Sequence, residues 1–196
     1  TYCNPLSIPD IPRGKDDWYP YEKGMFSHER KPRGLDVPDY RSISDPMVFY
    51  WEGKWYLYPS YGMAWVSEDF QNWVHVRTQP YCPKYSPTIV PWRGKFLLTA
   101  WFCPLYVGMS PLGPFEVLGD FVDLEGKSFT PCDPALFIDE DEKIYLYAYD
   151  HTAKEDEHRI VGYELDAEDP RKVVRGPILI IEMDPQNKPW ERHGLH

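Results

Sequence analysis

The stretch "SISDPMVFYWEGKWYLY", residues 42–58, contains two short aromatic runs on either side of Glu52-Gly53-Lys54. Aromatic and β-branched residues favour strands, and a glycine between two such runs supplies the positive φ that a tight hairpin needs. The stretch therefore predicts a β-hairpin. It also raises a question, because Asp45-Pro46 opens the first run. The pair can start a simple turn, or it can hold a carboxylate at the rim of a site.

The same pattern recurs twice along the chain. Ser86-Pro87 precedes an apolar run that turns at Gly94, and Asp133-Pro134 precedes one that turns at an acidic cluster, residues 139–142. The starts at 45, 86 and 133 lie 41 and 47 positions apart. Periods of this size are typical of β-propeller blades, each a small antiparallel sheet of about four strands. The second half of each repeat agrees, since it holds an apolar strand, a polar turn and another strand.

These repeats divide the chain into segments. We expect residues 41–80, 81–125 and 126–180 to form three blades, residues 1–40 to form an N-terminal extension or outer strand, and residues 181–196 to start a fourth blade. No long apolar stripe with the helical period is present, which predicts an all-β domain with little helix. Three blades do not close a ring, because propellers usually have at least four. The chain is therefore predicted to be an incomplete propeller, completed by a further segment or by another chain.

Composition excludes several classes of function. The formal net charge is −10, whereas a surface for nucleic acid or an anionic membrane needs clustered Lys and Arg. No window of eighteen apolar residues is present that could span a membrane. A neutral partner such as a sugar fits the aromatic content of 16%, because sugars stack on Trp and Tyr rings. The four cysteines show no CxxC spacing, which predicts small buried side chains or one long-range disulfide rather than a zinc ribbon.

Propeller geometry brings the three strand starts together. The innermost strand of each blade begins near the central axis, so Asp45, Ser86 and Asp133 are predicted to face one axial cavity. Glycoside hydrolysis uses converging acids: one carboxylate activates water, a protonated acid donates to the leaving oxygen, and a third raises the donor's pKa by like-charge repulsion. Alternatively, each Asp-Pro only starts a local turn. The equivalent positions in two repeats leave both interpretations open.

Four runs carry a family resemblance: "SDPMVFYWEGKWYLYPS", "YSPTIVPWRGKFLLTAWF", "SPLGPFEVLGDF" and "CDPALFIDEDEKIYLYAYD". In this order they resemble glycoside hydrolase family 43 and its clan over about residues 40–196. The resemblance implies a five-bladed β-propeller, here incomplete with about three blades and the start of a fourth. It implies an inverting hydrolase that removes arabinose, xylose or galactose units from plant-type glycans. Asp45 then matches the general base, and Asp133 matches the acid that orients the proton donor and adjusts its pKa.

The proton donor itself is not apparent. The family's donor is a Glu at the start of a blade-four strand, within an EGP-like motif, and this sequence has no such motif. Glu191 in "PWERHG" is the nearest candidate by position. No apolar strand follows it, so we expect Glu191 to be a loop or surface residue and the donor to lie beyond residue 196.

After the second strand of each blade, the chain returns to the same rim. Tyr61 and Trp101 are the best candidates there for stacking on a sugar's C–H face, and their alternative role is core packing between blades. Ser86 can hydrogen-bond a sugar hydroxyl, or only start a strand. No cofactor is expected, and His193 and His196 lack a third metal ligand. A structural calcium or sodium ion is known in the family, but the sequence shows no site for one. Other residues expected at the rim are Met63, Phe102, Tyr149 and Asp150.

Together these observations predict an inverting hydrolase whose partner is an oligosaccharide or polysaccharide, with Asp45 deprotonating the attacking water. Two alternatives stay open. One is a propeller that holds glycans without cutting them, or a structural arc that completes another chain. The other is a five-bladed fructan hydrolase, whose nucleophilic Asp follows Asn in an NDP-like motif. Ser44 stands at that position here, which favours this second alternative less.

Overall fold

The computed structural model describes residue 8 and residues 45–60, 63–77, 85–150, 159–184 and 186–188, and all its regular elements are strands. Three antiparallel sheets of four strands each follow one another along the chain, and a two-stranded hairpin lies between the second and the third. The first sheet comprises β1 (Met47–Trp51), β2 (Lys54–Tyr58), β3 (Met63–Ser67) and β4 (Val74–Arg77). The second comprises β5 (Thr88–Trp92), β6 (Lys95–Thr99), β7 (Leu105–Gly108) and β8 (Phe115–Gly119). The hairpin is β9 (Phe121–Val122) with β10 (Ser128–Phe129), and the third sheet comprises β11 (Cys132–Ile138), β12 (Ile144–Tyr149), β13 (Arg159–Leu165) and β14 (Val173–Glu182).

Tight hairpins join the first two strands of the first two sheets, as predicted. Glu52 and Gly53 have φ values of 46° and 83°, and Arg93 and Gly94 have 48° and 73°. Positive φ at both central residues is the signature of the type I′ turn, whose twist matches that of the flanking strands. The register that follows pairs Trp51 with Lys54 and continues without a break through β1 and β2.

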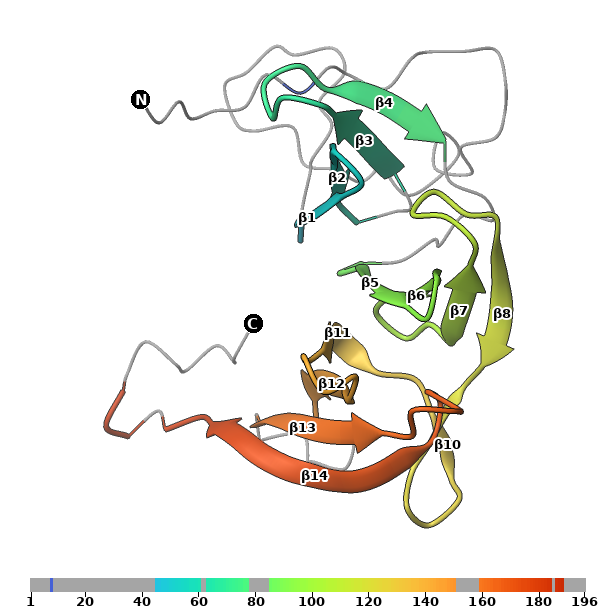
Figure 1. Cartoon of the computed structure of the whole chain (residues 1–196). Helices are drawn as coiled ribbons and strands as arrows, with labels where there is room; N and C mark the ends of the chain where they lie inside the picture. Colours follow the sequence, from blue (N-terminus) through green and yellow to red (C-terminus); the bar gives the residue numbers. More distant parts are fainter. Residues whose placement is uncertain are drawn as a thin grey trace, which may run out of the picture.

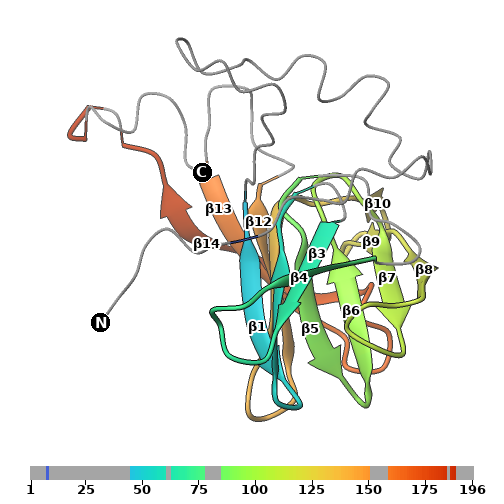
Figure 2. The ribbon, with the colours of Figure 1, turned by 90° about the horizontal axis from the view of Figure 1, so that it is seen from above.

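The three sheets form an arc, with β1, β5 and β11 on its inner side and β4, β8 and β14 on its outer side (Figure 1). Figure 2 views the arc at right angles to Figure 1. Neighbouring inner strands are joined by hydrogen bonds. The Ile89 N–H donates to Met47 Sδ (3.1 Å), and the Leu136 N–H donates to Thr88 Oγ1 (3.0 Å). Each sheet is therefore one blade, and the expectation of an incomplete β-propeller built from four-stranded blades is confirmed.

Apolar side chains fill the two spaces between the blades. One core cluster joins the first and second blades through residues such as Tyr58, Leu98 and Phe115, and the other joins the second and third through residues such as Leu97 and Leu146. Strand alternation places Leu97 and Leu98 on opposite faces of β6, so the second blade contributes to both clusters. Burying one such leucine contributes about 1.5–3 kcal/mol.

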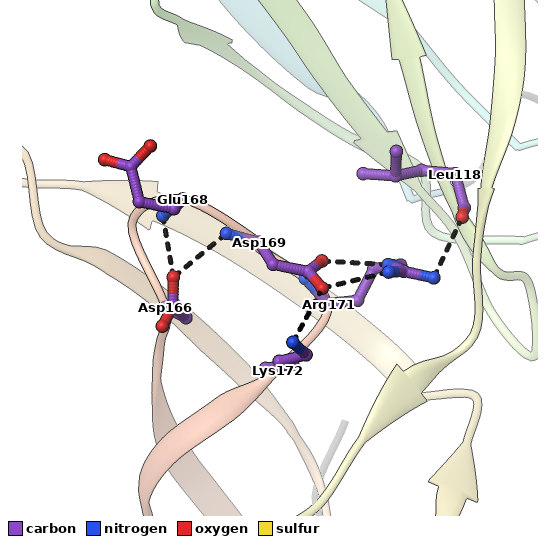
Figure 3. Close-up of polar contacts among 6 residues, drawn as sticks. All are labelled: Leu118, Asp166, Glu168, Asp169, Arg171 and Lys172. Carbon is purple, nitrogen blue, oxygen red and sulfur yellow. Dashed lines mark hydrogen bonds and ion pairs between the residues drawn. The ribbon is translucent and has the colours of Figure 1, made fainter.

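A polar contact between the second and third blades lies at the β13–β14 turn (Figure 3). Asp169 accepts two hydrogen bonds from the guanidinium of Arg171, at 2.9 Å each, and Arg171 Nη1 donates to the carbonyl of Leu118 (3.3 Å). The Arg171 carbonyl accepts from the Val122 N–H (2.8 Å). The pKa of the Asp169 carboxyl is held below its usual range, chiefly by the Arg171 hydrogen bonds. Within the third blade this turn lies at the end of the sheet opposite the start of β11.

The third blade has one apolar face that the second blade does not cover. Phe137, Ile178, Leu179 and Ile180 are between 42% and 54% exposed there and along β14. Such a continuous run of exposed apolar residues is unusual for a surface that faces only water. β14 continues to Glu182, two residues past the boundary expected at residue 180, and the β9–β10 hairpin spans the boundary expected at residue 125. The expected N-terminal extension, residues 1–40, lies outside the described residues apart from Ile8. In the described part of the chain no helix is long and apolar enough to cross a membrane.

Candidate active site

Three residues at equivalent positions precede or begin the inner strands, and all three adopt the same unusual backbone conformation. Asp45, Ser86 and Asp133 have φ values of 49°, 50° and 46°. The left-handed region costs a non-glycine residue roughly 1–2 kcal/mol, although Asp visits it more readily than most because its short side chain can form local hydrogen bonds. In β11 the register also shifts between Cys132 and Ala135, so Asp133 lies in a β-bulge. Bulges and positive φ values re-aim side chains, and both are common beside active sites.

A line of hydrogen bonds connects the two carboxylates of these strand starts. Ser60 Oγ donates to Asp45 Oδ2 (2.8 Å) and accepts from the Ser86 N–H (3.1 Å). Ser86 Oγ donates in turn to Asp133 Oδ1 (2.9 Å). The line crosses all three blades and joins residues up to 47 positions apart in sequence. The structure therefore brings Asp45, Ser86 and Asp133 to one place on the inner side of the arc.

Ser60 is the member of this line that sequence reasoning missed. Its hydroxyl is almost fully buried, with 1% of the residue exposed, whereas Asp45 and Asp133 are both exposed. Because a serine hydroxyl has one proton, donation to Asp45 leaves its lone pairs for the Ser86 N–H. The buried Ser60 thus orients the exposed carboxylate of Asp45 by a hydrogen bond from the interior. The only available signal was its place two residues after β2, where the chain returns to the rim.

Ser86 was expected to bind a sugar hydroxyl or only to start a strand. Its side chain donates to Asp133, so its proton is already committed, although its oxygen can still accept a hydrogen bond. The two interpretations of Asp-Pro are also separated by the geometry. The carboxylates of Asp45 and Asp133 accept from serines 15 and 47 positions away, which a local turn does not require.

Trp101 lies beside the same strand starts. Its ring packs edge-on against Tyr85 at 5.5 Å between centroids and tilts against Phe102 at 4.6 Å. Its indole N–H donates to Cys132 Sγ (3.0 Å), and Cys132 directly precedes Asp133. Burial is the main cause that raises the pKa of the Cys132 thiol, with Asp133 adding to it and the Trp101 hydrogen bond opposing it. This contact fixes the indole next to Asp133 and had no signal in the sequence.

Asp150 and Tyr149, also expected at the rim, have mainly structural contacts. Asp150 is 5% exposed, and its Oδ2 forms an ion pair with Arg159 Nη2 (3.0 Å), so its carboxylate is engaged within the third blade. Tyr149 pairs with Cys132 across β11 and β12, and burial raises the pKa of its phenol. Neither residue joins the line of hydrogen bonds between Asp45 and Asp133.

Several expected site residues cannot be placed. Tyr61, Glu191, His193 and His196 lie outside the described residues, and only the backbone of Met63 is described, as the first residue of β3. Within the described ranges, no group of three or more His, Cys, Asp or Glu side chains is arranged to hold a metal ion. Cys132 is a free thiol and Cys103 is buried, while Cys3 and Cys82 also lie outside the described residues.

Comparison with known proteins identifies the fold. No protein-family model and no curated protein matches the sequence. Among solved structures, the chain is similar to a thermostable family-43 glycoside hydrolase, with a TM-score of 0.58 and 20% sequence identity over 74% of this chain. This chain has the fold of the family 43 glycoside hydrolases. The fold that the sequence resemblance implied is thereby confirmed.

Two further solved structures are similar. An endo-arabinase from Bacteroides thetaiotaomicron gives a TM-score of 0.58 at 18% identity over 72% of this chain. An arabinoxylan arabinofuranohydrolase of family 43 from Bacillus subtilis, in complex with cellotetraose, gives 0.52 at 19% identity over 72%. The match covers 54% of the thermostable hydrolase, 56% of the endo-arabinase and 41% of the arabinofuranohydrolase. The chain thus spans about half the length of these solved structures.

Proposed function

We propose that this chain forms part of the catalytic domain of an inverting glycoside hydrolase that removes pentose or galactose units from a neutral plant-type glycan. The observation that carries the proposal is the line of hydrogen bonds from Asp45 through Ser60 and Ser86 to Asp133. It brings together two exposed carboxylates from different blades of a fold shared with glycoside hydrolases. Two acids on either side of a scissile bond are the minimum equipment of this chemistry.

In this proposal Asp45 is the general base. One of its oxygens is oriented by Ser60, and because the residue is exposed, the other can accept a proton from a water molecule. That water attacks the anomeric carbon while a separate acid protonates the leaving oxygen. An inverting enzyme keeps base and acid roughly 6.5–9.5 Å apart, so that the water fits between base and sugar.

Asp133 is proposed to act on the proton donor rather than on the water. Its Oδ1 accepts from Ser86, which orients the carboxylate from the second blade. A negative charge held near a carboxylic acid disfavours ionisation of that acid and so keeps it protonated for donation. The donor is not one of the two residues of this line. Glu191 lies outside the described residues, and we place the donor in a further part of the propeller.

Further blades would also cover the apolar face of the third blade. Phe137 and Ile180 lie on a surface that, in a closed propeller, packs against the next sheet. The greater length of the neighbours supports this inference, since each extends well beyond the region matched by this chain. A segment of the same protein or a separate chain can supply those blades.

A second function is favoured by one observation, the lack of a third carboxylate on the hydrogen-bonded line among the described residues. A propeller that binds glycans without cleaving them needs the aromatic rings and the polar rim but no proton donor. Ligand binding with no product release would distinguish this function from hydrolysis.

The test uses the chain together with its complete propeller. Hydrolysis of p-nitrophenyl pentosides and galactosides and of arabinoxylan is measured for the parent protein and for Asp45→Asn, Asp133→Asn and Asp120→Asn. Asp120 is an exposed aspartate between β8 and β9 and is the matched control. We expect both site variants to lose at least about a hundredfold in kcat, the range for one general acid–base group, and the control to keep its activity. Proton NMR of the first-formed anomer tests inversion. Full activity of Asp45→Asn would refute the base assignment.

A further inference from the structure

Three consecutive residues at the start of the third blade accept hydrogen bonds from the second blade. The acceptors are a backbone carbonyl, a thiol and a carboxylate, and the donors lie just before β5 and in the turn between β6 and β7. The three bonds run from the Phe102 N–H to the Pro131 carbonyl (2.7 Å), from Trp101 Nε1 to Cys132 Sγ (3.0 Å) and from Ser86 Oγ to Asp133 Oδ1 (2.9 Å). The position of Asp133 therefore depends on the second blade as well as on its own.

The donors of these three bonds are held together as one unit. The Trp101 N–H donates to the Tyr85 carbonyl (2.8 Å), and Tyr85 directly precedes Ser86. The Trp101 indole packs edge-on against the Tyr85 ring and tilts against the Phe102 ring, with centroids 5.5 Å and 4.6 Å away. Phe102 has a φ of 49°, in the left-handed region that a bulky residue rarely adopts. Because rings pack on two sides of the indole, its plane is fixed and its N–H is directed at Cys132.

Asp133 depends on this support because its own strand is irregular at that point. Its φ is 46°, and β11 pairs with β12 at Cys132 and again at Ala135, with a shift in register between them. A bulge disrupts the ladder locally and leaves its extra residue unpaired, so Cys132 is the paired residue directly before Asp133. Asp45, by contrast, is oriented by Ser60 of its own blade. A displacement of Cys132 should therefore move Asp133 and leave Asp45 in place.

Two attachments fix the Asp133 carboxylate better than one. The hydrogen bond from Ser86 fixes a distance to one carboxylate oxygen, but the side chain can still turn about that contact. The bond from Trp101 to Cys132 attaches the preceding residue to the same unit of the second blade and so restricts that rotation. An indole N–H only donates, and a thiol sulfur is a weak acceptor. The contribution of this bond is thus geometric more than energetic.

We propose that Trp101 is a positioning residue for Asp133: its indole N–H, acting through Cys132, holds the bulge in the conformation that directs the carboxylate at the proton donor. This role rests on the proposed function, in which Asp133 acts on that donor. It belongs to the N–H of Trp101 and not to the face of its ring. A misplacement of about 1 Å in a reacting group can lower a rate about a hundredfold, so the loss of even a weak hydrogen bond should be measurable in kcat.

The test compares variants that remove one end of the hydrogen bond at a time, in the chain with its complete propeller. Trp101→Phe keeps a flat ring and loses the N–H, Cys132→Ala loses the acceptor, and Cys132→Ser keeps an acceptor at the same place. Trp101→Phe is also combined with Cys132→Ala. Trp73→Phe is the matched control, because it makes the same change at a buried tryptophan of the first blade whose indole N–H has no hydrogen-bond partner among the described residues. Melting curves verify that each variant is folded.

We expect Trp101→Phe and Cys132→Ala each to lower kcat about tenfold and to change KM by less than about twofold. The double variant should be no slower than either single variant, because both substitutions break the same bond. Cys132→Ser and Trp73→Phe should keep kcat within about twofold of the parent protein. The proposal is overturned if Trp101→Phe keeps the parent kcat, if the two single losses multiply in the double variant, or if Cys132→Ser is as slow as Cys132→Ala. A rise in KM without a change in kcat would also overturn it, since Trp101 would then contact the sugar.

A second measurement needs no turnover. Carboxyl ¹³C NMR of the substrate-free protein follows the Asp133 signal, which is assigned by its absence in Asp133→Asn. Trp101→Phe and Cys132→Ala should shift this signal in the same direction, and Trp73→Phe should leave it unchanged. These shifts in a protein that hydrolyses no glycoside would refute the proposed function and retain the positioning of Asp133 by Trp101. Hydrolysis that needs Asp45 and Asp133, with an Asp133 signal that neither variant moves, would overturn the positioning role and retain the proposed function.

Discussion

Replacing Ser60 by alanine removes the central link between the two carboxylates. The Ser60 hydroxyl donates to Asp45 at 2.8 Å and accepts from the Ser86 N–H at 3.1 Å, and 1% of the residue is exposed. A hydrogen bond to a charged group contributes about 1.5–3 kcal/mol, and an unsatisfied buried N–H costs about 1–3 kcal/mol. Water can partly replace both lost hydrogen bonds, the one to Asp45 because Asp45 is exposed, and the one from the Ser86 N–H because Ser86 is only half-buried. We therefore expect a loss of about 2 kcal/mol in the free energy of unfolding.

The same substitution tests function separately from stability. A loss of about 2 kcal/mol lowers the melting temperature by about 4–8 °C in a chain of this size, which calorimetry detects. Ser60 is too buried to contact substrate, so kcat should fall about ten- to a hundredfold as Asp45 loses its orientation. KM should change by less than about twofold, because no ground-state contact is lost.

Ser128→Ala is the matched control, since Ser128 is exposed in β10. Ser128→Ala should change the free energy of unfolding by less than about 0.5 kcal/mol. Ser60→Cys keeps the shape of the side chain with a weak donor and should lie between the parent protein and Ser60→Ala. If Ser60→Ala has the same melting temperature and the same kcat as the parent protein, then the Ser60 hydrogen bonds do not hold Asp45 in place. A rise in KM alone would show that Ser60 acts on substrate binding instead.

Three further predictions concern stability. Gly108→Ala places a Cβ 2.6 Å from Cδ1 of the Phe115 ring, so overpacking should lower the free energy of unfolding by about 1–3 kcal/mol. Urea unfolding measures this loss, and an unchanged midpoint would contradict the packing of β7 against β8. Arg171 lowers the pKa of Asp169, so the ionised carboxylate stabilises the folded protein above the unfolded pKa near 3.9, and this stabilisation is lost as pH falls below that value. Asp169→Asn should therefore flatten the decline of the melting temperature below about pH 4, and parallel curves for parent and variant would contradict this assignment. Burial raises the pKa of the Tyr58 phenol well above its usual range, so its stabilising effect is present below the unfolded pKa near 10 and is lost at higher pH. In an ultraviolet titration Tyr58 should ionise only as the protein unfolds, and Tyr58→Phe should reduce the amplitude of that step, to which Tyr163 also contributes because burial raises its pKa too. Reversible ionisation of Tyr58 in the folded state would contradict its burial.

Local signals in the sequence were sufficient to predict the blades. The hairpin at Glu52-Gly53 and that at Arg93-Gly94 follow from turn chemistry, and the fourfold strand pattern follows from the period of the repeat. Equivalent positions in that repeat also singled out Asp45, Ser86 and Asp133 before any contact was known. Their proximity is a consequence of blade geometry, since equivalent positions on inner strands face the same axis.

The details of the site depend on contacts between blades, which have no local signal. Ser60 follows β2 as Ser110 follows β7, and only packing against the second blade buries Ser60 and places it between Asp45 and Ser86. The left-handed φ of Phe102 is likewise maintained by a hydrogen bond to Pro131, 29 positions further along the chain.

The amino-acid sequence alone determined the all-β class, the repeating blade and the pair of aspartates, because strand alternation, tight turns and repeats are encoded over a few neighbouring residues. The tertiary structure decided which side chains meet: Ser86 with Asp133 across 47 positions, and Trp101 with Cys132 across 31. Those contacts arise when apolar faces of successive sheets pack together, and the packing energy, rather than any local preference, brings the site's polar groups within hydrogen-bonding distance.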